Sequence, residues 1–139
     1  MKRTILAIAA ILAFCPVGLT QEEPKEPDAY ELAEKETERL QRLLKLDDGQ
    51  AFYVDSILQS NYIGLMESMK KLQKSRVSNS DIYMNERDAW MQKTYDAYKL
   101  VFTDEQWAAY LKSGGAREQK ARDKRKAAMQ AALSKTKKK

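Results

Sequence analysis

The sequence FTDEQW, residues 102–107, has the pattern of a helix N-terminus. The hydroxyl of Thr103 is placed to accept a hydrogen bond from the backbone amide of Gln106, and the side chain of Gln106 is placed to accept one from the amide of Thr103. This reciprocal arrangement is a capping box. The acidic residues Asp104 and Glu105, which follow the cap, are favoured there by the helix dipole. We therefore expect a helix to begin at Thr103.

A second stretch of the same design lies earlier in the chain. In LDDGQ, residues 46–50, Asp47 takes the capping position and Gln50 stands three residues later. The two stretches are 56 residues apart. The pairs Asp47 with Gln50 and Thr103 with Gln106 are the two helix-capping motifs of the chain, and they predict two helix starts related by an internal repeat.

The remaining helices follow from the spacing of apolar residues. Steps of three and four residues, with few helix breakers, predict helices over about 29–45, from the Asp47 cap to about 76, and over 81–101. The fourth is expected to run from Thr103 to a glycine stop at 113–115. The second helix would be roughly 43 Å long, more than a small globular core requires. The predicted fold class is all-α: an elongated bundle or cradle of about four helices, one of them long, with a basic helical C-terminal tail.

The first twenty residues have the features of a secretory signal peptide. A short basic start precedes an apolar run that is too short to cross a bilayer. The competing interpretation is a lipoprotein signal acylated at Cys15, but the neighbouring Phe14 and Pro16 argue against it. The signal predicts a periplasmic protein. Its expected segments are the signal peptide 1–20, a flexible linker 21–28, the helical domain 29–115 and the tail 116–139.

Charge is divided sharply between the domain and the tail. Residues 21–115 contain 13 basic and 18 acidic residues, a net charge of −5, whereas residues 116–139 contain ten basic and two acidic residues, a net charge of +8. The tail has no aromatic residue to stack on bases, and it follows an export signal, so we expect no nucleic-acid partner. Three roles stay open for it: weak contact with an anionic partner such as a membrane surface, packing on the acidic first helix, and solubility.

Catalytic chemistry is not indicated by the sequence. Beyond residue 20 the chain contains neither cysteine nor histidine, which excludes Ser-His-Asp and Cys-His catalysis and zinc sites with nitrogen and sulfur ligands. Four methionines, Met66, Met69, Met84 and Met91, allow an alternative interpretation as a soft Cu(I) site. Methionines at helical spacing more often fill a core or line an adaptable surface. We therefore predict no enzyme, no metal and no cofactor.

The two capping motifs, on a small exported helical chain, resemble the LTxxQ motif of the Spy/CpxP family of periplasmic proteins. The resemblance covers roughly residues 29–112. Asp47 replaces the threonine in the first copy and Phe102 replaces the leucine in the second, and each keeps the physical role of the residue it replaces. The resemblance implies an ATP-independent chaperone that holds unfolded proteins on a concave, coiled-coil-like helical surface, often as a dimer. A branch of the family damps envelope-stress signalling or responds to heavy metals.

Two classes of function are therefore expected. The first is a chaperone-like protein that binds unfolded or partly folded envelope proteins on an apolar helical surface. Its candidate contact residues are Leu58, Tyr62, Leu65, Met66, Met69, Tyr83, Trp90 and Met91. The second is a non-enzymatic regulatory or structural adaptor of envelope stress signalling that binds one specific partner. A chaperone should suppress the aggregation of several unrelated proteins, whereas an adaptor should bind one partner and ignore the rest.

Overall fold

A computed structural model describes residues 28–136 of the chain, and this part is all-α. The expected signal peptide 1–20 and residues 21–27 of the expected linker lie outside the described residues. The helical segments are α1 (Ala29–Leu44), α2 (Asp48–Lys74), α3 (Ser80–Val101), α4 (Asp104–Tyr110), a π-helical turn (Leu111–Gly115) and α5 (Ala116–Thr136). The first three agree closely with the predicted ranges, which confirms an all-α bundle.

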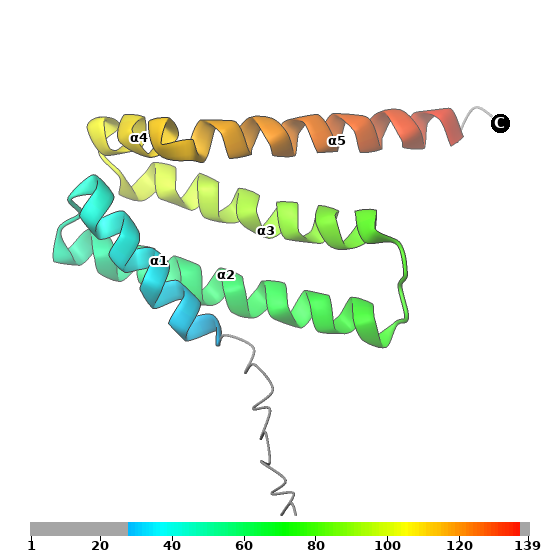
Figure 1. The fold of residues 1–139 in the computed structure, drawn as a ribbon, viewed down its shortest axis with the longest axis horizontal. Helices are drawn as coiled ribbons and strands as arrows, with labels where there is room; N and C mark the ends of the chain where they lie inside the picture. The colour runs from blue at the N-terminus through cyan, green and yellow to red at the C-terminus, as the bar shows by residue number, and fades with distance from the viewer. Residues whose placement is uncertain (1–27, 137–139) are drawn as a thin grey trace, which may run out of the picture.

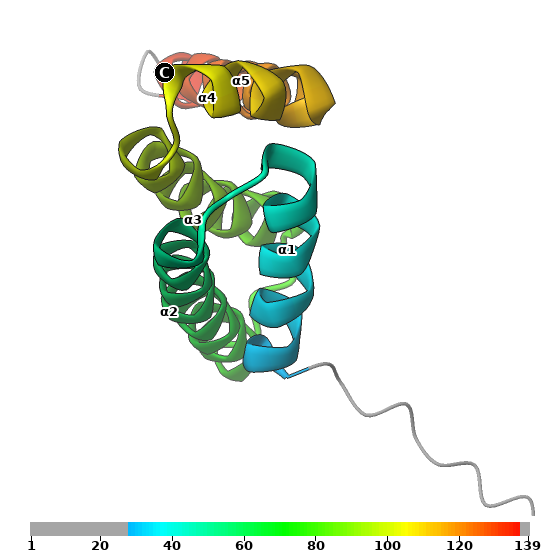
Figure 2. The same ribbon diagram turned by 90° about the vertical axis from the view of Figure 1, so that its left-hand side faces the viewer.

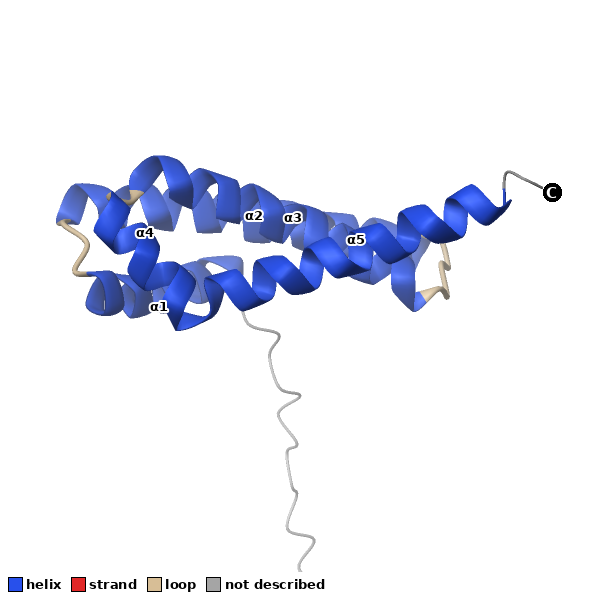
Figure 3. Ribbon diagram, turned by 90° about the horizontal axis from the view of Figure 1, so that it is seen from above, coloured by secondary structure: helices blue, strands red, loops and turns tan. Residues whose placement is uncertain are grey.

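The helices are stacked in layers. α2, α3 and the continuous α4–α5 segment lie one above another, and α1 crosses one end of α2 (Figure 1). α1 packs against α2 and α4, whereas α3 packs against α2 and α5. Seen end-on, α5 forms the outermost layer (Figure 2), and its C-terminal end extends past the turn between α2 and α3 (Figures 1 and 3). The molecule is therefore long in one direction.

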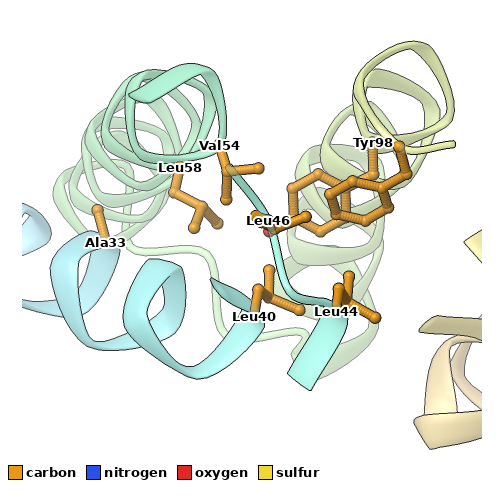
Figure 4. Packing of buried hydrophobic residues seen from close by; sticks show 8 residues of the cluster. Ala33, Leu40, Leu44, Leu46, Val54, Leu58 and Tyr98 are labelled. Carbon is orange, nitrogen blue, oxygen red and sulfur yellow. The ribbon is translucent and has the colours of Figure 1, made fainter. Parts of the chain in front are cut away.

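The hydrophobic core lies where α1 meets α2 and the C-terminal end of α3 (Figure 4). Leu40 and Leu58 are almost completely buried, and Tyr98 closes the core from α3. The full set of buried residues in this cluster is Ala33, Leu40, Leu44, Leu46, Val54, Leu58, Tyr98 and Phe102. The core thus draws on three helices and on the loop between α1 and α2.

The core does not extend along the whole hairpin formed by α2 and α3. After Leu58 no residue of α2 is buried, and before Thr94 no residue of α3 is buried. α1 is only 16 residues long and α2 is 27, so α1 covers the beginning of α2 and leaves the rest to α3 alone. We call the part of the hairpin beyond Leu58 and before Thr94 the distal half.

The predicted glycine stop is a local break rather than an end. Gly114 has φ 137° and ψ −18°, a conformation that residues with a side chain rarely adopt. α5 begins immediately afterwards at Ala116, so α4, the π-helical turn and α5 follow one another without a loop. Gly115 is also required for packing, because a Cβ atom there would lie 2.6 Å from Cε1 of Tyr110.

The basic tail packs on the body, but not in the way that the acidic first helix suggested. Over residues 116–136 it forms α5, whose Arg125 makes a bidentate ion pair with Asp88 of α3, at 2.5 and 2.7 Å. Arg122 is buried against the same helix, with its guanidinium 5.4 Å from the ring centre of Tyr95. The acidic residue that pairs with the tail is therefore on α3, not on α1.

Candidate functional site

Both predicted capping boxes are present. At the start of α2, the amide of Gln50 donates to Oδ1 of Asp47 at 2.7 Å, and the amide of Asp47 donates to Oε1 of Gln50 at 3.2 Å. At the start of α4, the amide of Gln106 donates to Oγ1 of Thr103 at 3.3 Å, and the amide of Thr103 donates to Oε1 of Gln106 at 3.0 Å. Each box satisfies backbone groups that a helix end leaves without an intrahelical partner.

The two boxes also bond to each other. Nε2 of Gln50 donates to Oε1 of Gln106 at 2.7 Å, and Nε2 of Gln106 donates to Oε1 of Gln50 at 3.0 Å. Gln50 further donates to the carbonyl of Val101, at the end of α3. This amide pair joins the start of α2, the end of α3 and the start of α4. The repeated motif therefore has a tertiary role in addition to starting two helices.

We expect the amide pair to behave as one coupled unit. Gln50→Ala and Gln106→Ala should each lower the free energy of unfolding by about 1–2 kcal/mol, because each removes the reciprocal hydrogen bond of a capping box and leaves a half-buried amide without its partner. In a double-mutant cycle the coupling energy should be about 1 kcal/mol. Urea unfolding followed by circular dichroism measures both quantities.

Gln59→Ala is the matched control for this cycle. The Gln59 side chain is also half-buried on α2, but it bonds only to Asp55 of its own helix. Gln59→Ala should lower the free energy of unfolding by less than Gln50→Ala or Gln106→Ala does. A double-mutant cycle of Gln59→Ala with Gln106→Ala should show no coupling energy. Strictly additive effects of Gln50→Ala and Gln106→Ala would show that the amide pair does not join the two helix starts in solution.

The distal half carries most of the predicted contact residues. We call these residues the distal surface; all of them are half-buried, and they are Tyr62, Leu65, Met66, Met69, Tyr83, Trp90 and Met91. Leu58, the eighth candidate, is only 1% exposed and belongs to the core, so it offers no surface contact in this fold. The distal surface is left partly open because two helices alone cannot enclose their facing side chains.

Trp90 is held at the distal surface by an unusually close approach to α2. A Cβ atom on Gly64 would lie 2.2 Å from Cη2 of Trp90, so the indole ring rests on the backbone of α2 at a residue with no side chain. Nε1 of Trp90 donates to Oγ of Ser68 at 3.2 Å and to Oε1 of Glu86 at 3.0 Å. The apolar spacing does not predict the role of Gly64, although an isolated glycine in a helical pattern is a signal of close packing.

Aromatic residues join the core to α4. The ring of Tyr98 stacks on Phe102 with centroids 5.0 Å apart, and its edge meets Tyr110 at 5.5 Å. Burial raises the pKa of Tyr98 above its ordinary value, and burial together with the nearby Glu118 raises the pKa of Tyr110 to about 12. Burial likewise raises the pKa of Tyr62. All three phenols are therefore neutral at neutral pH and act through packing.

Large apolar side chains are also exposed at the opposite end, beside the capping boxes. Phe52 is 68% exposed, Tyr53 62% and Leu100 89%. The rings of Phe52 and Tyr53 are 5.9 Å apart, and Tyr53 and Leu100 line the same open depression of about 430 Å³. We call these three residues the end patch. The apolar spacing that predicted the helices did not identify them, because they lie outside the buried stripes.

Within residues 28–136 no group of three or more acidic side chains is arranged to hold a metal ion. In the same part of the chain no helix combines the length and the apolar character needed to cross a membrane. An open cleft of about 600 Å³ lies between α3 and α5 and is lined mostly by polar side chains, among them Asp88, Gln92 and Arg122.

Comparison of the chain with protein-family models, with curated proteins and with solved structures finds no match.

Proposed function

We propose that this protein is an ATP-independent, chaperone-like protein that binds unfolded or partly folded polypeptides along the distal surface. The observation that carries the proposal is the confinement of the core to one end of the hairpin. The same helices continue beyond the core with apolar and aromatic side chains that are only half-buried. An apolar segment of a client that settles on them would remove further apolar surface from water, at roughly 25 cal/mol per Å².

The composition of the distal surface suits binding of many sequences rather than one. Met66 and Met69 on α2 and Met91 on α3 have flexible, polarizable side chains that adapt to differently shaped partners. Surfaces rich in methionine are typical of promiscuous binders. The rigid element of the surface is Trp90, which Gly64 and Ser68 fix in place. A rigid anchor surrounded by adaptable side chains favours weak binding with broad client range.

Exposed charges surround the distal surface. Lys74 and Arg76 lie at the end of α2, Arg87 lies on α3, and Glu67 is exposed between the methionines of α2. Charges at the rim of an interface mainly raise the rate of encounter and contribute little to the lifetime of the complex. In the proposal they steer clients and still allow release. Residues 1–20, a short basic start followed by an apolar run, are typical of an export signal and favour a periplasmic location for this activity.

The proposal is tested by suppression of aggregation, measured by light scattering on several unrelated unfolding proteins. The double variant Leu65→Ser with Met69→Ser makes the distal surface more polar. We expect it to lose roughly half or more of the suppression at equal molar ratio, because a few central apolar residues usually carry most of the binding energy. Circular dichroism must show that the variant keeps its helices.

The matched control is Phe52→Ser with Leu100→Ser, which removes two apolar side chains of greater exposure from the end patch. It should suppress aggregation as the parent does. An equal loss in both double variants would show that general surface hydrophobicity, not the distal surface, carries the activity. Failure of the parent to suppress any of the unrelated proteins would overturn the chaperone proposal.

A second candidate function is a regulatory or structural adaptor that binds one partner of the cell envelope. The end patch favours it, because exposed aromatic and leucine side chains around one open depression are typical of a docking site for a single apolar anchor. Under this alternative the two double variants exchange roles. A pull-down would lose its partner with the end-patch variant and retain it with the distal variant.

A further inference from the structure

The cations of α5 are divided between two sides of the helix. Arg122 and Arg125 face α3, where Arg122 is buried and Arg125 is paired with Asp88. Arg117, Lys120 and Lys124 are exposed, and none of them forms an ion pair within the described residues. Within the described part of the tail, two cations therefore dock on the body, and Arg117, Lys120 and Lys124 remain in solvent.

The exposed cations form one stripe. Steps of three, four and eleven residues separate Arg117, Lys120, Lys124 and Lys135, which places them on the side of the helix away from Arg122 and Arg125. We call these four residues the outer stripe. At 1.5 Å per residue it is roughly 27 Å long. Between its cations the same side of α5 carries the small residues Ala127, Ala131 and Ser134, and the exposed Asp123, three residues after Lys120, borders it.

Carboxylates are absent from the outer stripe. The two acidic residues of the described tail are Glu118 and Asp123. Asp123 accepts a hydrogen bond from Gln119 and lines the cleft toward α3, whereas Glu118 lies in the first turn of α5 beside Tyr110. The stripe is therefore of a single sign, and α5 is the outermost layer of the molecule, so no other helix covers it (Figure 2).

Exposed carboxylates lie on the side of the molecule opposite α5, as well as at the start of α4, where Asp104 and Glu105 are exposed. Glu31 and Glu34 are exposed at the N-terminal end of α1, which lies far from α5 in two perpendicular views (Figures 1 and 2). An anionic surface would attract the outer stripe and repel Glu31 and Glu34, which favours an orientation with α5 toward the surface and α1 away from it.

We propose that the outer stripe of α5 docks the protein on an anionic lipid surface. A straight row of cations on the outermost helix can meet a flat layer of phosphate head groups along its whole length. The small residues between the cations allow close approach without insertion, and the apolar distal surface does not take part. Exposed Lys and Arg side chains are attracted to anionic head groups individually, and the attraction falls off within about a Debye length.

A lipid surface fits the outer stripe better than a nucleic acid does. Single-stranded nucleic acids are bound with aromatic side chains on which bases stack, and α5 contains none. The side chains between the cations are alanine and serine, which offer little to read base edges. Duplex DNA is nevertheless a polyanion of high charge density, so it serves as the competing ligand in the test.

The test is co-sedimentation of the full chain with vesicles of equal parts phosphatidylcholine and phosphatidylglycerol, and with vesicles of pure phosphatidylcholine. Lys120→Gln with Lys124→Gln should weaken partitioning onto the anionic vesicles roughly 30-fold, because each cation contributes about fivefold. The matched control, Lys70→Gln with Lys71→Gln, removes the same charge from two exposed residues of α2 and should change partitioning little. Residues 1–20 are common to all variants, and pure phosphatidylcholine measures their contribution.

Each of the following four outcomes would overturn the proposal. Equal weakening by the two double variants would mean that net charge, not the outer stripe, drives binding. Equal partitioning of the parent onto anionic and neutral vesicles would mean that α5 does not bind lipid head groups. Tighter binding of the parent to a DNA duplex than to vesicles at the same phosphate concentration would assign the stripe to nucleic acid. Partitioning that does not weaken with added salt would exclude an electrostatic contact.

Discussion

Leu40→Ala is expected to lower the free energy of unfolding by about 3 kcal/mol, within the range of about 2–5 kcal/mol for large-to-small changes in a core. The Leu40 side chain has no exposed surface, and in Figure 4 it points from α1 into the cluster, toward Leu46. Its truncation removes apolar contacts with both neighbouring helices and leaves a cavity that three packed helices cannot easily close. Urea unfolding followed by circular dichroism should show a lower midpoint with an unchanged slope.

Leu43→Ala is the matched control for this prediction. Leu43 belongs to the same helix and undergoes the same chemical change, but it is 43% exposed. Since helix propensity changes equally in both variants, the difference between them measures burial alone. Leu43→Ala should lower the free energy of unfolding by about 1 kcal/mol or less. Equal losses of stability in Leu40→Ala and Leu43→Ala would show that Leu40 is not in the core, and would contradict the packing of α1 on the hairpin.

Gly64→Ala is expected to lower the free energy of unfolding by about 2–3 kcal/mol, although alanine is the better helix former by about 1 kcal/mol. The new methyl group would lie 2.2 Å from Cη2 and 2.6 Å from Cζ2 and Cζ3 of Trp90, far inside van der Waals contact. The indole ring is rigid, so it must leave α2 and give up the hydrogen bond to Ser68. Its fluorescence should shift to longer wavelength as the ring becomes more hydrated.

The fluorescence measurement needs a background without the second tryptophan, Trp107, which Trp107→Phe supplies. Ser60→Ala is the control, because Ser60 is an exposed residue one turn before Gly64 on the same helix. It should change stability by no more than about 0.5 kcal/mol and leave the emission of Trp90 unchanged. If Gly64→Ala melts and fluoresces like the parent, the close approach of Trp90 to α2 does not exist in solution.

The local features of this fold could be predicted from the sequence because they depend on neighbours in the chain. A capping box needs only a side chain at the cap and another three residues later, so Thr103 and Gln106 were enough to place the start of α4. Helix bounds followed from apolar spacing. At the start of α3 the side chain of Asn79 caps the helix by accepting a hydrogen bond from the amide of Asp81.

Features that depend on the arrangement of helices could not be predicted in the same way. The repeat indicated two similar helix starts, but whether Gln50 meets Gln106 depends on how the hairpin brings their helices together. Leu58 and Leu65 have the same character in the sequence, and only the length of α1 decides that one is buried and the other half-buried. α1 and α3 each contain four acidic and three basic residues, so charge alone does not decide on which helix the tail packs. The tail leaves the body at Gly114 in a direction that leads it along α3.

The confinement of the core to one end also determines how the molecule can open. Separating α2 from α3 near the turn at residues 75–79 disturbs only half-buried contacts, whereas separating them near Tyr98 disrupts the whole buried cluster. Backbone amides should therefore become accessible to exchange at free energies that fall along the hairpin, from nearly the global value beside Leu58 to much lower values near Lys74. Partial unfolding of this kind enlarges the apolar surface without loss of the fold, since the amide pair and the three-helix core remain intact.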